Sequence, residues 1–156
     1  MNITYQTAKT KEAFEDGKAL FQAYAKSLNL DLSFQDFEKE LDAIDKQYNK
    51  PKGALILAYK EKTAVGCAAI RELDSETAEL KRMYVHPDNR GLQIGRKLLE
   101  LSIETAKKLN YKKIRLDTLP TMLYAQRLYR MSGFFEIPSY RFNPVSGAVY
   151  MEKKLT

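Results

Sequence analysis

Two arginines and two glycines lie close together in one short segment, at Arg90, Gly91, Gly95 and Arg96. The residues before this segment alternate as in a strand, and those after it have the apolar spacing of an amphipathic helix. The first N–H groups of a helix have no acceptor within the helix, and the helix dipole adds partial positive charge there. Glycines let a ligand approach the backbone, and arginines add charge. Residues 90–96 therefore predict a site for phosphate or pyrophosphate, here named the phosphate cradle.

The spacing of the cradle glycines differs from the common nucleotide-binding patterns. The chain contains no G-x-x-x-x-G-K-S/T, and the cradle is not G-x-G-x-x-G. The segment Arg90-Gly91-Leu92-Gln93-Ile94-Gly95 instead resembles the acyl-CoA-binding pattern Q/R-x-x-G-x-G/A of the GNAT superfamily of N-acetyltransferases. Gln93 departs from it, because the family usually has its middle glycine there. The resemblance implies acetyl-CoA as the acyl donor, with its phosphates on the N–H groups of residues 91–96.

A second fingerprint of the same family, N-x-x-A-x-x-L-Y-x-x-x-G-F, lies further along the chain. The residues that match it are Ala125, Leu128, Tyr129, Gly133 and Phe134. Met122 replaces the asparagine that contacts the pantetheine arm in the family, so the resemblance does not imply that contact here.

Acetyl transfer from a thioester to an amine requires a neutral amine, so a base must remove the ammonium proton directly or through water. The resemblance implies Glu79 as this base and Tyr129 as the acid that protonates the departing thiolate. It also implies that backbone groups of Met83, Tyr84 and Val85 hold the oxyanion and the pantetheine amides. Direct attack within a ternary complex is therefore expected, since the sequence shows no Ser-His-Asp or Cys-His set for a covalent intermediate.

Each of these residues also has a simpler interpretation. The cradle could be an ordinary strand-to-helix connection. Glu79 could be a strand carboxylate paired with Arg71 or Lys81, and Tyr129 could be a core aromatic residue. The single His86 is expected to be structural or solvated.

Two other classes of function stay open for the whole chain. A non-catalytic acyl-CoA-binding or regulatory module would keep the cradle and dispense with Glu79 and Tyr129, although both are present. A nucleic-acid-binding protein would use the lysines at 107–108 and 112–113, but no RRM, KH or zinc-finger pattern accompanies them. The resemblance therefore favours the enzyme.

Composition sets the broad class. The chain has 156 residues, of which 44% are hydrophobic, and this is enough for one core and one domain over residues 1–156. Its net charge of +6 suits an acidic ligand such as coenzyme A, but equally nucleic acid or a membrane surface. One histidine and one cysteine, Cys67, cannot make a structural zinc site, so no metal is expected.

The expected setting is cytoplasmic. A lone cysteine forms no intrachain disulfide, which suits a reducing compartment, and its apolar context predicts a buried thiol. The N-terminal residues do not form a signal peptide, and no stretch approaches the roughly 18 apolar residues of a membrane span. The expected partner is a small-molecule amine acceptor, not a membrane or a nucleic acid, and a homodimer is compatible with the sequence.

Hydrophobic periodicity predicts the elements of the first half. Strands are expected at 2–8, 54–59 and 63–70, and helices at 11–28 and from Ser33 to about 48. Residues 71–77 read as a polar turn into the strand that carries Glu79. Strict alternation would place Leu80, Arg82 and Tyr84 on one face of it, and Glu79, Lys81, Met83 and Val85 on the other.

In the second half, a long helix ends at Asn110, and a strand at 114–118, a helix at 120–131 and a strand at 148–155 follow. The order β-α-α-β-β-β-α-β-α-β implies an α/β (mixed α+β) fold, with a mostly antiparallel twisted sheet and helices on both faces, as in the GNAT architecture.

The acceptor is less defined by the sequence. The resemblance places Tyr24, Phe34, Phe37 and Tyr48 near the acceptor, and it places the loop 140–148 beside it. Arg71, Arg82 and Arg141 could meet a carboxylate of the substrate or could form salt bridges within the protein.

Overall fold

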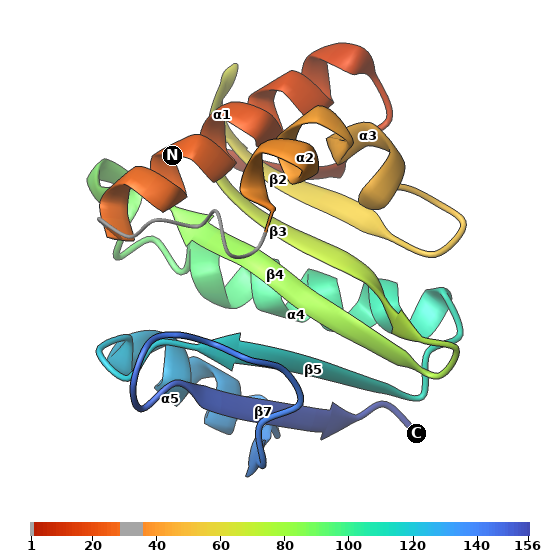
Figure 1. Cartoon of the computed structure of the whole chain (residues 1–156). Helices are drawn as coiled ribbons and strands as arrows, with labels where there is room; N and C mark the ends of the chain where they lie inside the picture. The colour runs from red at the N-terminus through yellow and green to blue at the C-terminus, as the bar shows by residue number, and fades with distance from the viewer. Residues whose placement is uncertain (1, 29–35) are drawn as a thin grey trace.

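A single seven-stranded sheet, in the order β1-β2-β3-β4-β5-β7-β6, joins strands from both ends of the chain in the computed structural model (Figure 1). The structure describes residues 2–28 and 36–156. Strands β4 and β5 are parallel, and the other neighbouring strands pair antiparallel. The predicted mixed, mostly antiparallel sheet is therefore confirmed.

The N-terminal half of the chain forms strands β1 to β4, which are neighbours in the sheet, and helices α1 to α3. The edge strand β1 (Ile3–Thr7) precedes helix α1 (Lys11–Leu28), and the short helices α2 (Phe37–Asp42) and α3 (Ile44–Gln47) follow. Strands β2 (Ala54–Lys60) and β3 (Thr63–Asp74) form a hairpin. Strand β4 (Thr77–Val85) then leads to the cradle through a 3-10 turn, η2 (Pro87–Asn89).

The C-terminal half completes the sheet. Helix α4 (Ile94–Lys108) starts in the cradle and returns the chain to β5 (Lys113–Thr118). Helix α5 (Leu123–Met131) leads to the hairpin of β6 (Phe135–Ile137) and β7 (Val149–Lys154). None of the described helices is both long and apolar enough to cross a lipid bilayer.

Each face of the sheet has its own apolar core. Phe14, Leu20 and Phe21 of α1 pack with the face that carries Leu55 and Leu57. On the other face, α4 packs through a buried stripe that consists of Ile94, Leu98, Leu99, Ile103 and Ala106. The helices thus lie on both faces, as predicted, and Figure 1 shows α1 to α3 and α4 on opposite sides of the strands.

Strands β4 and β5 separate part-way along their length. Their pairing ends at Glu79 and Arg115, although β4 continues to Val85 and β5 to Thr118. Figure 1 shows the two arrows diverging toward their C-terminal ends. Since no described strand pairs with this side of β4, no sheet hydrogen bonds occupy its backbone groups there, although the oxygen of Val85 accepts from Arg90.

The prediction of strict alternation along β4 is wrong, because the strand has a β-bulge. Arg82 has a φ of 57°, and Arg82 and Met83 together stand opposite Ala68. The extra residue reverses the alternation. Leu80 and Met83 therefore both face the α4 core, whereas Tyr84 faces the α1 core.

Three other predicted elements also differ in their bounds, and one strand is additional. Residues 71–74 extend β3, so the turn before β4 is shorter than expected. The second predicted helix is divided at Ala43 into α2 and α3, and its predicted start at Ser33 lies outside the described residues. Helix α5 begins at Leu123 instead of residue 120. Strand β6 was not predicted, because three residues carry no periodicity.

Candidate active site

The gap between β4 and β5 forms a wedge-shaped cavity of about 80 Å³ that connects the two faces of the sheet. Leu80, Met83, Leu116, Ala125 and Tyr129 belong to the α4 side of the cavity. The other side is lined by Tyr24 and Leu28 from α1, Lys81 and Arg82 from β4, Asp117 from β5, and Asn143 and Val145 from the β6–β7 loop. We name the whole cavity the wedge. The first set of residues forms its α4 half, and the second set forms its α1 half.

The cradle lies where β4 leads into α4. Gly91 has a φ of 88°, a conformation that favours glycine, and Gln93 adopts the left-handed conformation with a φ of 63°. Gln93 thus keeps a glycine-like backbone at the position where the family pattern has glycine. The first α-helical hydrogen bond runs from the N–H of Lys97 to the oxygen of Gln93. Within the described residues, the N–H groups of Ile94, Gly95 and Arg96 therefore have no acceptor.

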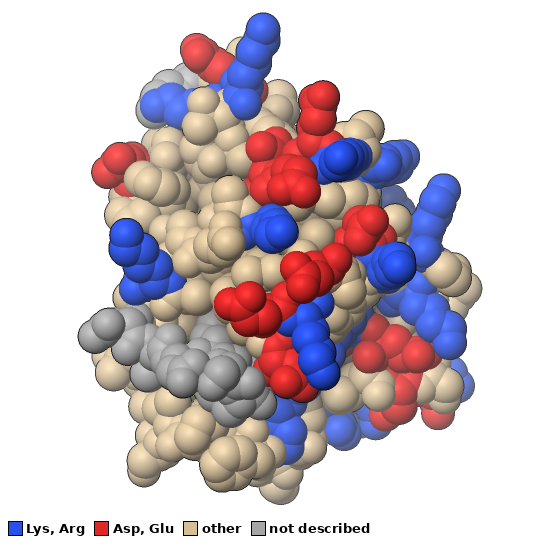
Figure 2. Space-filling view, turned by 45° about the horizontal axis from the view of Figure 1, so that its top comes forward, with Lys and Arg blue, Asp and Glu red and all other residues tan. Residues whose placement is uncertain are grey.

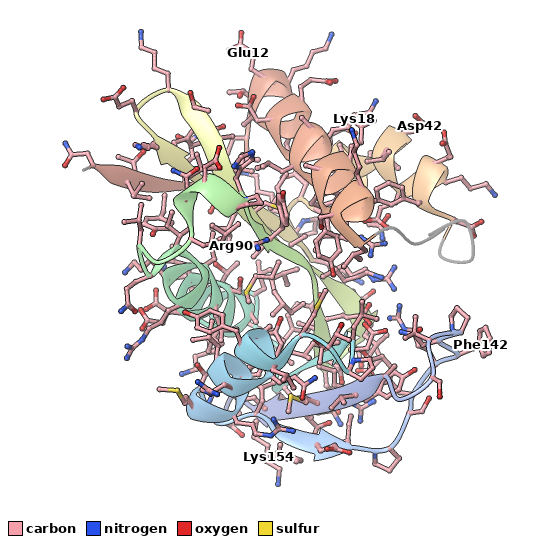
Figure 3. All side chains as sticks on the ribbon, turned by 90° about the vertical axis from the view of Figure 1, so that its left-hand side faces the viewer. Glu12, Lys18, Asp42, Arg90, Phe142 and Lys154 are labelled. Atoms are coloured by element: carbon pink, nitrogen blue, oxygen red, sulfur yellow. The ribbon has the colours of Figure 1, made fainter. Side chains whose placement is uncertain are left out.

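The cradle side chains leave this helix end open. A Cβ atom at Gly95 would lie 3.7 Å from Leu128 and 3.9 Å from Val85, so protein packing alone does not require glycine there. Arg90 donates through its Nε to the oxygen of Val85 at 3.2 Å. Figure 3 shows Arg90 at the C-terminal end of β4, beside the start of α4. An anion at the helix end would meet free N–H groups and a nearby guanidinium.

Tyr129 lies in the α4 half of the wedge. The residue is 6% exposed, and its ring packs against Phe134, with 5.8 Å between ring centroids. Among the described residues, nothing contacts its hydroxyl at hydrogen-bond distance. Burial, together with Tyr24 and the charge of Asp117, raises the pKa of the Tyr129 hydroxyl. The hydroxyl is therefore a protonated, unused hydrogen-bond donor in the wedge.

Glu79 is fully buried beside the wedge and is surrounded by donors. Its Oε1 accepts from Arg71 Nε at 2.8 Å, and its Oε2 accepts from the hydroxyl of Tyr140 at 2.7 Å and from Arg141. Burial acts to raise the pKa of Glu79, but Lys81 and the two guanidinium groups hold it below the usual range. Glu79 is therefore an ionised carboxylate whose two oxygens are already occupied.

A second buried ion pair connects α2 to the bulge of β4. Arg82 donates to Glu40 through Nε at 2.9 Å and through Nη2 at 2.8 Å, and Tyr48 donates to the same carboxylate at 3.0 Å. Phe37 stacks on the guanidinium, with 5.4 Å from Cζ to the ring centroid. These contacts fix α2 over the bulge.

Of the aromatic residues expected near the acceptor, the structure places only Tyr24 in the wedge. Tyr48 is in the α1 core, Phe37 covers Arg82, and Phe34 lies outside the described residues. The arginines expected to meet a substrate carboxylate, namely Arg71, Arg82 and Arg141, are instead paired with Glu79 and Glu40.

Lys81 and Asp117 are wedge residues that the sequence did not single out as site residues. Lys81 is 7% exposed, and burial together with Arg82 lowers its pKa to about 8. Asp117 accepts a hydrogen bond from Asn143 at 3.2 Å. The sequence feature that could have indicated them is their position in the strands, because ligands often bind at the C-terminal ends of neighbouring parallel strands, and both residues lie toward that end of β4 and β5.

Cys67 and His86 have structural contacts outside the wedge. Cys67 is fully buried, its Sγ donates to the oxygen of Arg82 at 3.2 Å, and burial raises its pKa. The predicted buried thiol is thus confirmed. His86 accepts from the N–H of Asp88 at 3.2 Å and caps η2, so its role is structural.

The surface charge is mixed. Figure 2 shows Lys and Arg interspersed with Asp and Glu on the face that it presents, instead of one continuous basic patch. Lys112, one of the lysines considered for nucleic-acid binding, is paired with Glu76 at 2.9 Å. This arrangement gives the nucleic-acid hypothesis no support.

A helix end with free N–H groups, next to a split between parallel strands, suits a ligand with phosphates at one end and a thin amide-containing arm. The fold and the site thus define a class of protein, the acyltransferases that use coenzyme A. The family model described as the acetyltransferase (GNAT) family matches residues 18–134, and the chain therefore belongs to this family. It is an N-acetyltransferase.

Proteins of similar sequence agree with this assignment. An uncharacterised N-acetyltransferase of Schizosaccharomyces pombe is 36% identical over 157 residues, which cover 99% of this chain and 96% of the relative. A protein of Azospirillum brasilense named IAA acetyltransferase is 37% identical over 109 residues, or 68% of this chain and 71% of that protein.

Solved structures share the fold. A GNAT-family acetyltransferase from Staphylococcus aureus has a TM-score of 0.81 and 26% identity, and covers 99% of this chain and 100% of its own. An N-acetyltransferase from Thermoplasma acidophilum, solved in complex with coenzyme A, has a TM-score of 0.75, 19% identity and 99% coverage of each chain.

Proposed function

We propose that this N-acetyltransferase moves the acetyl group of acetyl-CoA to the primary amine of a small-molecule acceptor. The observation that carries the proposal is the end of the β4–β5 pairing at Glu79 and Arg115, upstream of the open N-terminus of α4. A pantetheine arm could lie along the unpaired edge of β4 while its phosphates bind the helix end.

In this proposal, acetyl-CoA binds at the sites expected from the sequence. The N–H groups of residues 91–96 bind the pyrophosphate, with charge from Arg90 and Arg96. Backbone groups of Met83, Tyr84 and Val85 bind the pantetheine amides and the thioester oxygen. Solved proteins with this fold have been crystallised with coenzyme A, which supports the choice of donor.

The acceptor enters the α1 half of the wedge. Two residues of the β6–β7 loop line this half, and the loop is held by the contacts of Tyr140 and Arg141 with Glu79. A cavity of about 80 Å³ favours a small amine over a long peptide. The name of the Azospirillum relative, IAA acetyltransferase, also denotes a small-molecule substrate for that protein.

Transfer proceeds in a ternary complex. The neutral amine attacks the thioester carbon, and coenzyme A leaves as a thiolate. The Tyr129 hydroxyl donates to the departing sulfur. Because its pKa lies above the thiol value of about 8.5, we assign to it a hydrogen bond that stabilises the thiolate instead of complete transfer of its proton.

Glu79 has a different role in this proposal from that of a direct base. Its oxygens already accept from Arg71, Tyr140 and Arg141, and proton acceptance from an amine would require one of these donors to leave. We propose that Glu79 positions these three side chains beside the acceptor.

Thermal unfolding with acetyl-CoA tests the donor site. A ligand that binds only the folded protein raises the melting temperature by mass action. Gly95→Glu places a negative side chain in the cradle and should abolish the shift, whereas Thr63→Glu, on an exposed strand end, should preserve it. Thiol release with a panel of amines then tests transfer. An equal acetyl-CoA shift in both variants would contradict the assignment of the cradle.

A further inference from the structure

The charges around the α1 half of the wedge are paired, with two exceptions. The ion pairs are Arg71–Glu79, Arg141–Glu79, Arg82–Glu40 and Arg115–Glu152. Lys81 and Asp117 line the same cavity, and within residues 2–28 and 36–156 neither forms a salt bridge, although the charge of Lys81 acts on Glu79 and that of Asp117 acts on Arg141. The site thus offers one cation and one anion to a ligand.

Lys81 lies in an excess of positive charge. Glu79 is one carboxylate shared by two guanidinium groups, so this cluster carries a net positive charge beside Lys81. Lys81 itself is only 7% exposed, and no described residue accepts a hydrogen bond from its Nζ. Partial loss of the water around an ammonium group carries a free-energy cost. An anionic group of a ligand would remove that cost.

Asp117 lies on the opposite strand of the wedge. Its carboxylate receives one hydrogen bond, from Asn143. The charge of Asp117 also acts on tyrosines in both halves of the wedge. Burial is the largest cause that raises the pKa of Tyr129 and of Tyr24, the latter to about 12, and the negative charge of Asp117 raises both further. An acceptor ammonium placed at Asp117 is therefore near the hydroxyl assigned to the departing sulfur.

We propose, on the basis of the proposed function, that the acceptor is a free amino acid, with its carboxylate bound by Lys81 and its ammonium group received by Asp117. A zwitterion matches the two unpaired charges of the cavity, and neither a simple alkylamine nor a polyamine does. Tyr24, Leu28 and Val145 give the same space an apolar wall, which suits an aliphatic side chain.

The reaction balances with these groups. Asp117 takes one proton from the ammonium group and passes it to solvent. The freed nitrogen lone pair forms the C–N bond to the acetyl carbon, and the C–S bond breaks with its electrons on sulfur. The thiolate, stabilised by the Tyr129 hydroxyl, then takes up the second proton, which the attacking nitrogen loses, and coenzyme A is released as the thiol. The products are an N-acetylamino acid, coenzyme A and one proton.

Paired substrates test the recognition of the carboxylate. Thiol release from acetyl-CoA is measured with L-amino acids that have apolar side chains, and with the carboxamide of each. The carboxamide keeps the amine and the side chain but lacks the negative charge. At least one acid should have a kcat/KM more than tenfold above that of its carboxamide, although the carboxamide is the more easily deprotonated amine.

Variants of the two residues separate their roles. Lys81→Met should lower the ratio of kcat/KM between acid and carboxamide at least tenfold, and Lys81→Arg should retain part of it. Asp117→Asn should lower kcat/KM for acid and carboxamide together by roughly 10²-fold, as expected for loss of a general base. Lys62→Met, in the exposed β2–β3 turn, is the matched control and should leave the ratio unchanged.

Acetyl-CoA-dependent stabilisation distinguishes failure of this inference from failure of the proposed function. Equal rates for acids and carboxamides in the unaltered protein, or transfer to other amines only, would overturn the amino-acid inference and leave the acetyltransferase proposal intact. An equal loss for both substrates in Lys81→Met would also overturn carboxylate recognition by Lys81. Absence of both acetyl-CoA stabilisation and thiol release would overturn the proposed function and the inference together.

Discussion

Tyr129 and Glu79, the two residues expected to catalyse the reaction, differ in how the protein surrounds them. The hydroxyl of Tyr129 has no described hydrogen-bond partner and faces the wedge, whereas Glu79 is occupied by two arginines and a tyrosine. A group that must act on a substrate needs a free position for it. Tyr129 meets this requirement and Glu79 does not, although both match the family pattern.

Tyr129→Phe should therefore reduce turnover with little effect on stability. The change removes a hydroxyl that bonds to no described residue, so no buried partner is left unpaired, and the free energy of unfolding should change by less than about 1 kcal/mol. Loss of the bond to the departing sulfur should lower kcat by on the order of 10²-fold. Steady-state rates at saturating acetyl-CoA measure this, with Tyr5→Phe on the edge strand as the control. Full activity would make Tyr129 structural.

Glu79→Gln should act mainly on stability. The substitution would leave two partly buried guanidinium groups without their counter-charge, and loss of one partner of a buried ion pair typically costs about 3–5 kcal/mol. If Glu79 only positions its partners, kcat/KM of the variant should still fall at low pH in the same way as that of the unaltered protein. Urea unfolding and the pH profile of kcat/KM measure the two effects. A variant of normal stability that loses roughly 10²- to 10⁴-fold in rate, together with that fall at low pH, would make Glu79 the base.

The sequence predicts the proposed donor site in more detail than the acceptor site, for a physical reason. The cradle is local: its glycines, its arginines and the start of its helix are neighbours in the chain, and its pattern is visible within residues 90–96. The acceptor side depends on pairs such as Arg82–Glu40 and Arg141–Glu79, whose members are 42 and 62 residues apart. Sequence patterns cannot show which of several arginines will find which carboxylate.

At the scale of elements, the two long helices α1 and α4 were predicted accurately because their apolar periodicity extends over several turns. The bounds of α1 agree at both ends, and Asn110 adopts the predicted left-handed conformation after α4. The bulge of β4 was missed, because Arg82 is a residue type that gives no local signal for a positive φ. The tertiary pairing of Arg82 with Glu40 is what stabilises that conformation.

This pairing predicts that the position of α2 depends on one carboxylate. Glu40→Gln should lower the free energy of unfolding by about 3–5 kcal/mol, the usual cost of removing one member of a buried ion pair, since it removes the carboxylate that accepts two hydrogen bonds from Arg82. The double variant Glu40→Met with Arg82→Met should recover part of the loss, because both charges of the pair are removed together. Chemical denaturation measures all three proteins.

The exposed ion pair Arg96–Glu100, at 3.6 Å, supplies the control for this experiment. Glu100→Gln should change stability by less than about 1 kcal/mol, as is usual for pairs on a surface. Similar losses in Glu40→Gln and Glu100→Gln would contradict a special role of the buried pair in holding α2.

For the whole molecule, the two buried carboxylates couple folding to pH. The pKa values of Glu40 and Glu79 are both lowered in the folded protein, in each case against the effect of burial and by basic neighbours. A carboxyl group whose pKa falls on folding binds fewer protons in the folded state than in the unfolded one. Its contribution to stability is therefore complete above the unfolded pKa of about 4.3, and is lost as the pH falls through the folded pKa.

We therefore expect the free energy of unfolding to be nearly constant from about pH 7 to pH 5 and to fall steeply below about pH 4. Urea unfolding at a series of pH values measures this curve. Glu40→Gln should flatten the acid slope, because one of the groups that take up protons on unfolding is removed. Glu104→Gln, an exposed carboxylate without an ion pair among the described residues, should leave the slope as it is. An acid slope that is the same in Glu40→Gln as in the unaltered protein would mean that this buried pair does not link folding to protonation.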